Sequence, residues 1–185
     1  MNTEWFENRP IIIAITGSNG AGKTTFFHSY LSDTGLFFVN ADDLAEEFGI
    51  GAYEAAKIAD KLRHTLVTGR ESFIFETVLS DPVGEKISFL KNANSNGYHV
   101  ALIFILINDE SSSIERVALR VTQGGHDVPE EKLRDRFART RQNLKRAIES
   151  LPLVLIFDNS DLFDPYRFMA VYVDGHLFAG RPVEN

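Results

Sequence analysis

Two kinds of hydrophobic segment alternate along this chain. Five short runs are almost continuously apolar and rich in β-branched or aromatic residues, which is typical of strands buried on both faces. These runs are residues 11–15, 36–39, 72–75, 100–107 and 153–157. The pattern therefore predicts five strands that are buried on both faces of a sheet.

The segments between these runs carry apolar residues at helical spacing. Residues 55–66, 83–90 and 133–148 place hydrophobic side chains three or four positions apart, which predicts helices with one buried face. Gly97 follows the second of these segments, and Pro129 and Pro152 flank the third, as expected for helix ends. Ser112-x-x-Glu115 matches a capping box and predicts another helix from about residue 114.

Strands that alternate with helices build a parallel sheet covered by helices on both faces. After the fifth strand, the segment 158–160 is expected to form a turn organised by Asp158. Residues 169–173 and 176–178 then flank Asp174-Gly175, which indicates a C-terminal β-hairpin at the edge of the sheet. The chain shows no repeat, low-complexity tract or linker, so residues 1–185 are interpreted as a single domain.

A glycine-rich segment follows the first expected strand. Residues 17–24, Gly-Ser-Asn-Gly-Ala-Gly-Lys-Thr, match G-x-x-x-x-G-K-[ST] at every fixed position. Glycines let successive backbone N–H groups wrap a polyphosphate, and the following helix directs its free N–H groups at the same anion. A glycine-rich turn without a ligand is the alternative, but the motif also has the strand before it and the helix after it that phosphate binding requires.

This segment predicts a P-loop that binds ATP together with Mg²⁺. Lys23 is expected to contact the β- and γ-phosphates and to act in catalysis, and Thr24 is expected to ligate Mg²⁺. The absence of an Asn-Lys-x-Asp segment favours ATP over GTP. The expected nucleotide-binding residues are Gly17, Ser18, Asn19, Gly20, Ala21, Gly22, Lys23, Thr24 and Thr25. The fold class is then α/β, a three-layer α/β/α sandwich of the P-loop NTPase type. Its resemblance to nucleoside-monophosphate-kinase-like folds implies parallel strands in the order 2-3-1-4-5.

Polar residues follow two of the expected strands, at the sheet edge where ligands bind in open parallel sheets. Asp42 is a candidate base and substrate-binding residue that takes the proton of an attacking hydroxyl, with a solvated turn acid as the alternative. Asp43-x-x-Glu46 is a capping-box pattern, so Asp43 is expected to cap the next helix. Glu76 and Thr77 are candidates for substrate binding, and Glu76 also for Mg²⁺, unless Glu76 is the structural partner of an arginine.

Seven arginines lie between residues 116 and 146, around the segment Gln-Gly-Gly-His-Asp-Val-Pro at residues 123–129. Its paired glycines can serve as a hinge, so we expect a lid over residues 116–140 that excludes water from the reaction. Arg120 and Arg136 bracket the hinge and are expected to contact the transferred phosphoryl group as catalytic residues. The other arginines are expected to form salt bridges with interleaved acids, and His126 is expected to be a turn residue.

Composition narrows the classes of partner. A net charge of −7 argues against nucleic-acid binding, and the longest apolar run, residues 100–107, is too short to cross a membrane. The chain has no Cys, which excludes disulfides and thiolate metal sites, and its first ten residues lack an apolar signal core. The expectation is a cytoplasmic protein whose partner is a small-molecule substrate.

In combination, these motifs resemble those of the zeta-toxin-like P-loop kinases. The resemblance rests on the P-loop, Asn-Ala-Asp-Asp at 40–43, Phe-Glu-Thr-Val-Leu-Ser at 75–80, and residues 120–129 followed by Arg136, and it spans most of residues 11–160. It implies that Asp42 is the general base and that Arg120 and Arg136 assist the transfer.

The segment Gly-Gly-His-Asp-Val-Pro at 124–129 is similar to that of a compact bacterial branch of this family. The best-known zeta toxins phosphorylate UDP-N-acetylglucosamine, so the resemblance implies a UDP-amino sugar as one substrate to test. It also raises an antitoxin-like protein partner as an open question.

The sequence thus favours an ATP-dependent kinase that transfers the γ-phosphate of ATP to a hydroxyl group of a small molecule. The alternative is a P-loop NTPase or nucleotide switch that signals to a protein partner through the lid. The two differ in what Asp42 contacts, which is a substrate hydroxyl in a kinase and only water or a helix end in a switch. A third possibility, an adaptor that merely binds nucleotide, accounts for neither the strand-tip acids nor the lid arginines.

Overall fold

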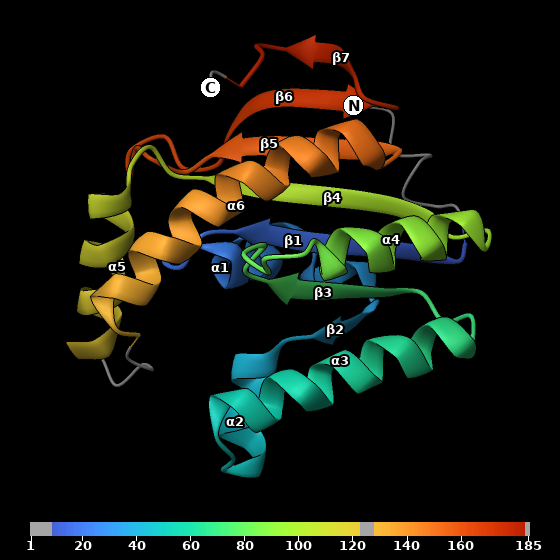
Figure 1. The fold of residues 1–185 in the computed structure, drawn as a ribbon, viewed down its shortest axis with the longest axis horizontal. Coiled ribbons are helices and arrows are strands. Elements are labelled where there is room, and N and C mark those ends of the chain that lie inside the picture. Colours follow the sequence, from blue (N-terminus) through green and yellow to red (C-terminus); the bar gives the residue numbers. More distant parts are fainter. Residues whose placement is uncertain (1–8, 123–127, 184–185) are drawn as a thin grey trace.

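The computed structural model describes residues 9–122 and 128–183. Within them, one seven-stranded sheet has the order β2-β3-β1-β4-β5-β6-β7 (Figure 1). The first five strands pair in parallel, and β6 and β7 add an antiparallel hairpin beyond β5. The predicted order 2-3-1-4-5 and the C-terminal hairpin are confirmed.

The strands lie close to the hydrophobic runs that predict them. They are β1 Ile11–Gly17, β2 Phe37–Val39, β3 Phe73–Thr77, β4 His99–Leu106, β5 Leu153–Asp158, β6 Arg167–Val173 and β7 His176–Gly180. Every residue of β1 is buried, as its continuous apolar sequence requires for a central strand. In register, Thr16 lies beside Thr77 and Gly17 beside Ile105, so the carboxyl ends of β1, β3 and β4 meet at one edge.

Helices cover both faces of this sheet. They are α1 Lys23–Tyr30, α2 Ala41–Phe48, α3 Ala52–Thr68, α4 Glu85–Ser95, α5 Glu110–Thr122 and α6 Glu130–Ser150, with a short 3₁₀ helix at Ser32–Thr34. One core packs β-strand residues such as Phe75 against Leu90 of α4 and Leu144 of α6. The other packs Ile74 and its neighbours against Phe26 of α1. Figure 1 shows α4 and α6 in front of the sheet and α1 behind it, which is the expected three-layer sandwich.

The helix ends agree with the sequence in part. Gly97 follows the end of α4 with a φ of 84°, and Pro152 follows the end of α6. The expected cap at Ser112 is wrong, because α5 begins at Glu110 and the side chain of Asp109 accepts a hydrogen bond of 2.8 Å from the Ser112 N–H. Asp is as good a cap as Ser, and here it lies close to the end of β4, so the helix begins earlier.

Among the described residues, no helix is both long enough and apolar enough to cross a membrane. The centre of the expected lid, residues 123–127 with His126, lies outside the described part of the chain.

Candidate active site

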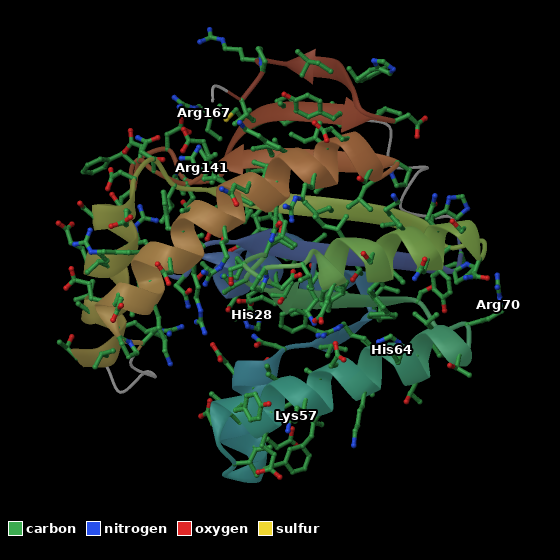
Figure 2. All side chains as sticks on the ribbon, in the orientation of Figure 1. His28, Lys57, His64, Arg70, Arg141 and Arg167 are labelled. Carbon is green, nitrogen blue, oxygen red and sulfur yellow. The ribbon has the colours of Figure 1, made fainter. Side chains whose placement is uncertain are left out.

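A cleft of about 440 Å³ opens at the carboxyl ends of the central strands. Its walls come from the P-loop, the start of α2, α3, the end of β3 and the start of α4, and residues of α5 and α6 complete it. The side chains in this region of the molecule are drawn in Figure 2. Parallel strands and their following loops thus bring together residues that are far apart in the sequence.

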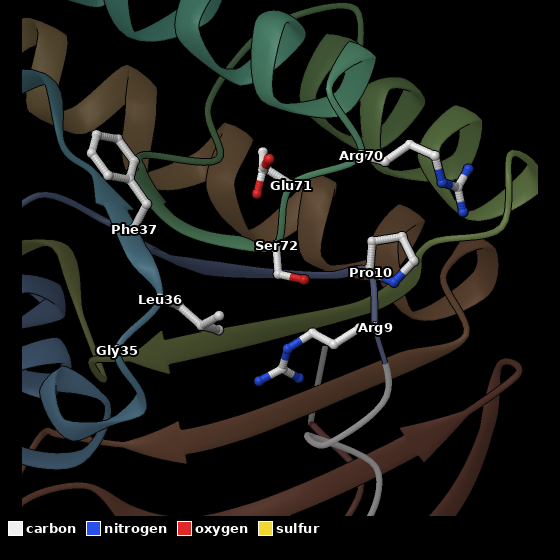
Figure 3. Close-up of a pocket in the computed structure, with 8 residues that line it drawn as sticks. All are labelled: Arg9, Pro10, Gly35, Leu36, Phe37, Arg70, Glu71 and Ser72. Atoms are coloured by element: carbon white, nitrogen blue, oxygen red, sulfur yellow. The ribbon is translucent and has the colours of Figure 1, made fainter.

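A second pocket of about 540 Å³ lies at the opposite, amino-terminal end of the strands, between Leu36, Arg70 and Ser72 (Figure 3). Its polar groups have structural contacts, since the Ser72 hydroxyl accepts a hydrogen bond from the Ile11 N–H and Arg70 donates to the Asn96 carbonyl. Neither the P-loop nor any strand-tip acid reaches it. The cleft of about 440 Å³ is therefore the candidate active site, although it is the smaller of the two.

The glycines of the P-loop are required by the folded chain itself. Gly17 and Gly22 have φ values of 148° and 90°. A Cβ on Gly17 would lie 2.4 Å from the Ile105 carbonyl oxygen, and one on Gly22 would lie 2.6 Å from Nδ2 of Asn159. That Nδ2 donates a 2.8 Å hydrogen bond to the Ala21 carbonyl. The loop is therefore held in its shape by the segments packed around it.

Lys23, Thr24 and Glu76 form one connected group at the base of the cleft. The Lys23 ammonium is buried, donates to the Ser18 carbonyl at 2.9 Å and lies 3.7 Å from Oε1 of Glu76. The Thr24 hydroxyl donates a 2.7 Å hydrogen bond to Oε2 of Glu76. Burial lowers the pKa of Lys23, and the carboxylates of Glu76 and Asp42 oppose that shift. Glu76 thus partners a lysine rather than an arginine.

The P-loop has the features that a bound polyphosphate needs. Gly22 precedes α1, and within residues 9–122 and 128–183 no side chain caps the first N–H groups of this helix. Among the described residues, the side-chain oxygen of Asn19 is buried without a hydrogen-bond partner. The uncapped N–H groups fit a ligand that accepts hydrogen bonds, such as a phosphate, whereas the Asn19 oxygen would need a donor.

The residues also fit Mg²⁺ bound to a nucleotide. No group of three metal-binding side chains is found in the described residues. A nucleotide-bound Mg²⁺ needs only one or two protein oxygens, because phosphate oxygens and water complete its shell. The adjacent Thr24 hydroxyl and Glu76 carboxylate can provide them.

Asp42 lines the cleft beside Arg120, which with Arg136 is one of the two arginines of the expected lid (the lid arginines). Oδ2 of Asp42 lies 3.7 Å from a guanidinium nitrogen of Arg120. The expectation that Asp43 caps α2 is wrong. The cap is Asn40, whose side-chain oxygen accepts a hydrogen bond of 2.9 Å from the Asp42 N–H. Asp43 is the next residue of α2, and burial together with the nearby Glu76 carboxylate raises its pKa. The helix begins three residues earlier than expected because Asn is also a strong cap.

The two lid arginines differ from the other arginines of residues 116–146 in their surroundings. Arg120 and Arg136 both line the cleft, as do Glu76 and Thr77. The others contact the protein: Arg134 pairs with Glu110 and Glu130, Arg139 donates to Ser80 and pairs with Asp135, and Arg141 (Figure 2) donates to Ile107 and Asn108. Thr25, the last expected nucleotide-binding residue, is directed at the Tyr166 hydroxyl.

Sequence reasoning missed three cleft residues, Arg63, Lys86 and Lys132. They lie on α3, α4 and α6, away from any motif. One signal was available, because Arg63 is four residues after Ala59 on the otherwise apolar face of α3. A charged residue at a core-facing position is unusual and indicates a specific partner.

The family model of the zeta toxins matches residues 2–167. The chain belongs to the zeta-toxin family. A curated relative, an uncharacterized protein of Haemophilus influenzae, is 29% identical over 126 residues, which are 65% of this chain and 88% of that protein.

Solved structures agree with this family fold. The AvrRxo1-ORF1:AvrRxo1-ORF2 structure with ATP is 20% identical, with a TM-score of 0.69 over 94% of this chain. The PezAT toxin-antitoxin system of Streptococcus pneumoniae is 22% identical, with a TM-score of 0.54 over 82% of this chain and 69% of that one. Shikimate kinase from Acinetobacter baumannii is 19% identical, with a TM-score of 0.50 over 76% of this chain and 83% of that one. This zeta-toxin-family chain spans only 61% of the AvrRxo1 chain that it matches.

Proposed function

We propose that this zeta-toxin-family protein is an ATP-dependent kinase that transfers the γ-phosphate of ATP to a hydroxyl group of a small molecule. The observation that carries the proposal is the convergence of Lys23, Glu76, Asp42 and two lid arginines on one cleft. These groups are the parts that phosphoryl transfer uses, since the reaction depends mainly on positioning and on stabilising charge.

Each residue has a distinct role in this proposal. Residues 17–25 bind the phosphates of ATP, and Lys23 neutralises charge at the β- and γ-phosphates. Asp42 accepts the proton of the attacking hydroxyl, and its contact with Arg120 orients the carboxylate. Arg120 and Arg136, on the lid formed within residues 116–140, bind the transferred phosphoryl oxygens.

Thr24 and Glu76 would hold Mg²⁺, and Thr77 at the same strand end would help to orient the substrate. When bound, the ion neutralises charge on the phosphate oxygens. The close contact of the Thr24 hydroxyl with Glu76 supports this assignment, because it places two oxygens of the kind that Mg²⁺ prefers side by side next to the P-loop.

A kinase explains the cleft better than a nucleotide switch does. Ala52, Ala56 and Ala59 of α3 line the cleft together with Asp42, and their small side chains leave room in it. A switch needs no such space for a second substrate. UDP-amino sugars belong among the acceptors to test, as the family resemblance implies, and the two-component AvrRxo1 and PezAT systems support a search for a protein partner.

The test is to incubate the protein with Mg-ATP and a metabolite panel that includes UDP-sugars, and to search for products by mass spectrometry. We expect one or more metabolites to gain the mass of a phosphoryl group, with an equal amount of ADP formed. Formation of ADP and free phosphate alone, whatever metabolite is present, would contradict the kinase and favour an NTPase.

A further inference from the structure

The cleft is much more basic than the protein around it. Its charged lining comprises six basic and two acidic side chains, in a chain of net charge −7. The two acids are matched by contacts with Lys23 and Arg120. The remaining basic residues are Arg63, Lys86, Lys132 and Arg136. A local excess of positive charge in an acidic protein attracts an anion to this place.

Arg63 and Lys86 share one carboxylate. Oδ1 of Asp60 lies 2.6 Å from a guanidinium nitrogen of Arg63 and 3.0 Å from the Lys86 ammonium. Burial raises the pKa of Asp60, but the hydrogen bonds from Lys86 and Arg63 lower it by more, so the pKa lies below its ordinary value. This carboxylate is therefore charged at neutral pH. One negative charge between two positive charges leaves the pair with a net charge of +1.

The burial of Arg63 is difficult to explain by stability alone. Its side chain is 5% exposed, with the guanidinium 5.0 Å from the centre of the Phe75 ring. Burying an ion pair costs as much as it gains, and apolar residues in its place are often equally stabilising. A guanidinium also has five N–H donors in a planar fork, so its contact with Asp60 leaves donors for a carboxylate or phosphate.

Arg63 reaches the cleft from the face of the sheet opposite the nucleotide loop. It packs on Phe75, which belongs to the core shared with α4 and α6. The next residue, Glu76, contacts Thr24 and Lys23 of α1 on the other face. The end of β3 thus separates Arg63 of α3 and Lys86 of α4 from the P-loop. A triphosphate bound in that loop would contact the start of α1 instead.

We propose that the phosphate acceptor carries an anionic group of its own, a phosphate or a carboxylate, which binds to the N–H donors of Arg63 and Lys86 that do not contact Asp60. This inference rests on the proposed kinase function and specifies its substrate class. The anion anchors the acceptor against α3 and α4, and the acceptor hydroxyl is then held beside Asp42. Neutral alcohols lack this anchor and are poor substrates.

The test measures anion binding by isothermal titration calorimetry. Inorganic phosphate and malonate are titrated separately into the protein saturated with Mg²⁺ and a non-hydrolysable ATP analogue, so that the P-loop is filled. The variants are Arg63→Gln and Lys86→Gln. Lys61→Gln and Lys91→Gln, exposed positions on the same two helices, are the matched controls. Tighter binding of phosphate than malonate would identify a phosphorylated acceptor, and the reverse a carboxylate.

We expect at least one anion to bind the wild type saturably, with its dissociation constant raised about tenfold in each cleft variant and unchanged in both controls, as for the loss of one charge-assisted hydrogen bond. Lys86 is only partly buried, so Lys86→Gln decides the matter if Arg63→Gln fails to fold. Equal binding by the wild type and Lys86→Gln, or no saturable binding by the wild type, would overturn the proposal. Failure of the wild type to bind the ATP analogue would instead contradict the proposed kinase function, whereas equal anion binding by the wild type and Lys86→Gln would contradict the acceptor site alone.

Discussion

Asp42 and Asp43 are neighbours in the sequence but have different surroundings. Asp42 lines the cleft next to Arg120, whereas Asp43 follows it in α2 and is not part of the cleft lining. The contact between Asp42 and Arg120 joins two exposed side chains, so its loss costs at most about 1 kcal/mol of folding free energy. A change in catalysis at Asp42 can therefore be separated from a change in stability.

Asp42→Asn keeps the shape of the side chain but cannot accept a proton. We expect kcat to fall by roughly 10²–10⁴-fold, with little change in ATP affinity or melting temperature. Asp43→Asn is the matched control and should keep most of the activity. Steady-state kinetics with an identified acceptor provide the measurement. If Asp43→Asn has the larger effect on kcat, Asp43 is the base and our assignment is reversed.

Asp158 organises the turn after β5, as the sequence predicts. Its Oδ1 accepts hydrogen bonds from the N–H and hydroxyl of Ser160, and Oδ2 lies 2.7 Å from Arg167 (Figure 2). Burial raises the pKa of Asp158, but these contacts lower it more, so the pKa lies below its ordinary value of 3.8. As the pH falls, this carboxylate is therefore protonated in the unfolded chain before it is protonated in the folded chain. The stabilisation that its charge contributes is complete above pH 3.8 and is lost as the pH falls through the folded-state pKa.

Asp158→Asn should therefore lower the free energy of unfolding by about 1 kcal/mol at pH 7. The difference from the wild type should shrink below pH 3.8, as followed by urea unfolding at a series of pH values. The exposed Asp164→Asn is the control and should differ little from the wild type at any pH. A difference for Asp158→Asn that does not change with pH would mean that the charge contributes nothing.

At this scale the sequence predicts the motif residues well and their partners poorly. The P-loop, Asp42, Glu76 and the two lid arginines come together as expected, because strand ends that align in a parallel sheet bring their loops to one edge. The sequence did not indicate that Asn40 caps α2, since Asn40 and Asp43 are both good caps three residues apart. Arg63 was missed because its role depends on Asp60 and Lys86, and Lys86 lies on another helix.

Among the structural elements, the P-loop is tied to its neighbours more tightly than its glycines suggest. Gly17 packs against the backbone of β4, and Gly20 against α5, where an added Cβ would lie 3.0 Å from the Arg116 Cβ. The glycines therefore belong to the packing between the loop, β4 and α5 as well as to ligand binding. Substitutions there should be costly even without nucleotide.

Gly17→Ala tests this packing. The new Cβ would meet the Ile105 carbonyl oxygen at 2.4 Å in a strained conformation, so we expect a loss of about 3 kcal/mol or more in the free energy of unfolding. Gly49→Ala is the matched control, since Gly49 also has a positive φ but no atom within 4 Å of the added Cβ, and should cost about 1 kcal/mol. Urea unfolding without nucleotide provides the comparison. Equal losses at the two positions would show that backbone strain alone, without the close contact, sets the requirement for glycine.

Helices α5 and α6 supply the two lid arginines. A guanidinium beside the transferred phosphoryl group gains most when charge spreads over its oxygens, so Arg120→Ala and Arg136→Ala should lower kcat about 10²-fold and ATP affinity only mildly. Lys at either position should restore activity only in part, because an ammonium lacks the two-pronged geometry. Arg146→Ala, further along α6 where the side chain contacts Asn143, should behave like the wild type. If all three alanine variants lose stability but keep the kcat of the wild type per folded molecule, the arginines have a structural role and not a catalytic one.

For the whole molecule, the hydrophobic runs were enough to predict a parallel sheet. A buried parallel sheet needs continuous apolar strands joined by helices, and β1 and β4 have that pattern. The strand order 2-3-1-4-5 was predicted instead from the similarity to nucleoside-monophosphate-kinase-like folds, and the structure has it. The acceptor side of the cleft could not be predicted in this way. It is built where α3 and α4 meet the end of β3, and their relative placement is a property of tertiary packing.

The central claim is that this cleft transfers the γ-phosphate of ATP to a hydroxyl of a small molecule. The most direct test supplies ATP labelled in its γ-phosphate, together with Mg²⁺ and a small-molecule cell extract, to the wild type and to Lys23→Ala. The account predicts that the label moves into a small molecule with the wild type and does not with Lys23→Ala, which lacks the charge directed at the β- and γ-phosphates. Label found only in inorganic phosphate with the wild type, or equal transfer by Lys23→Ala, would contradict it.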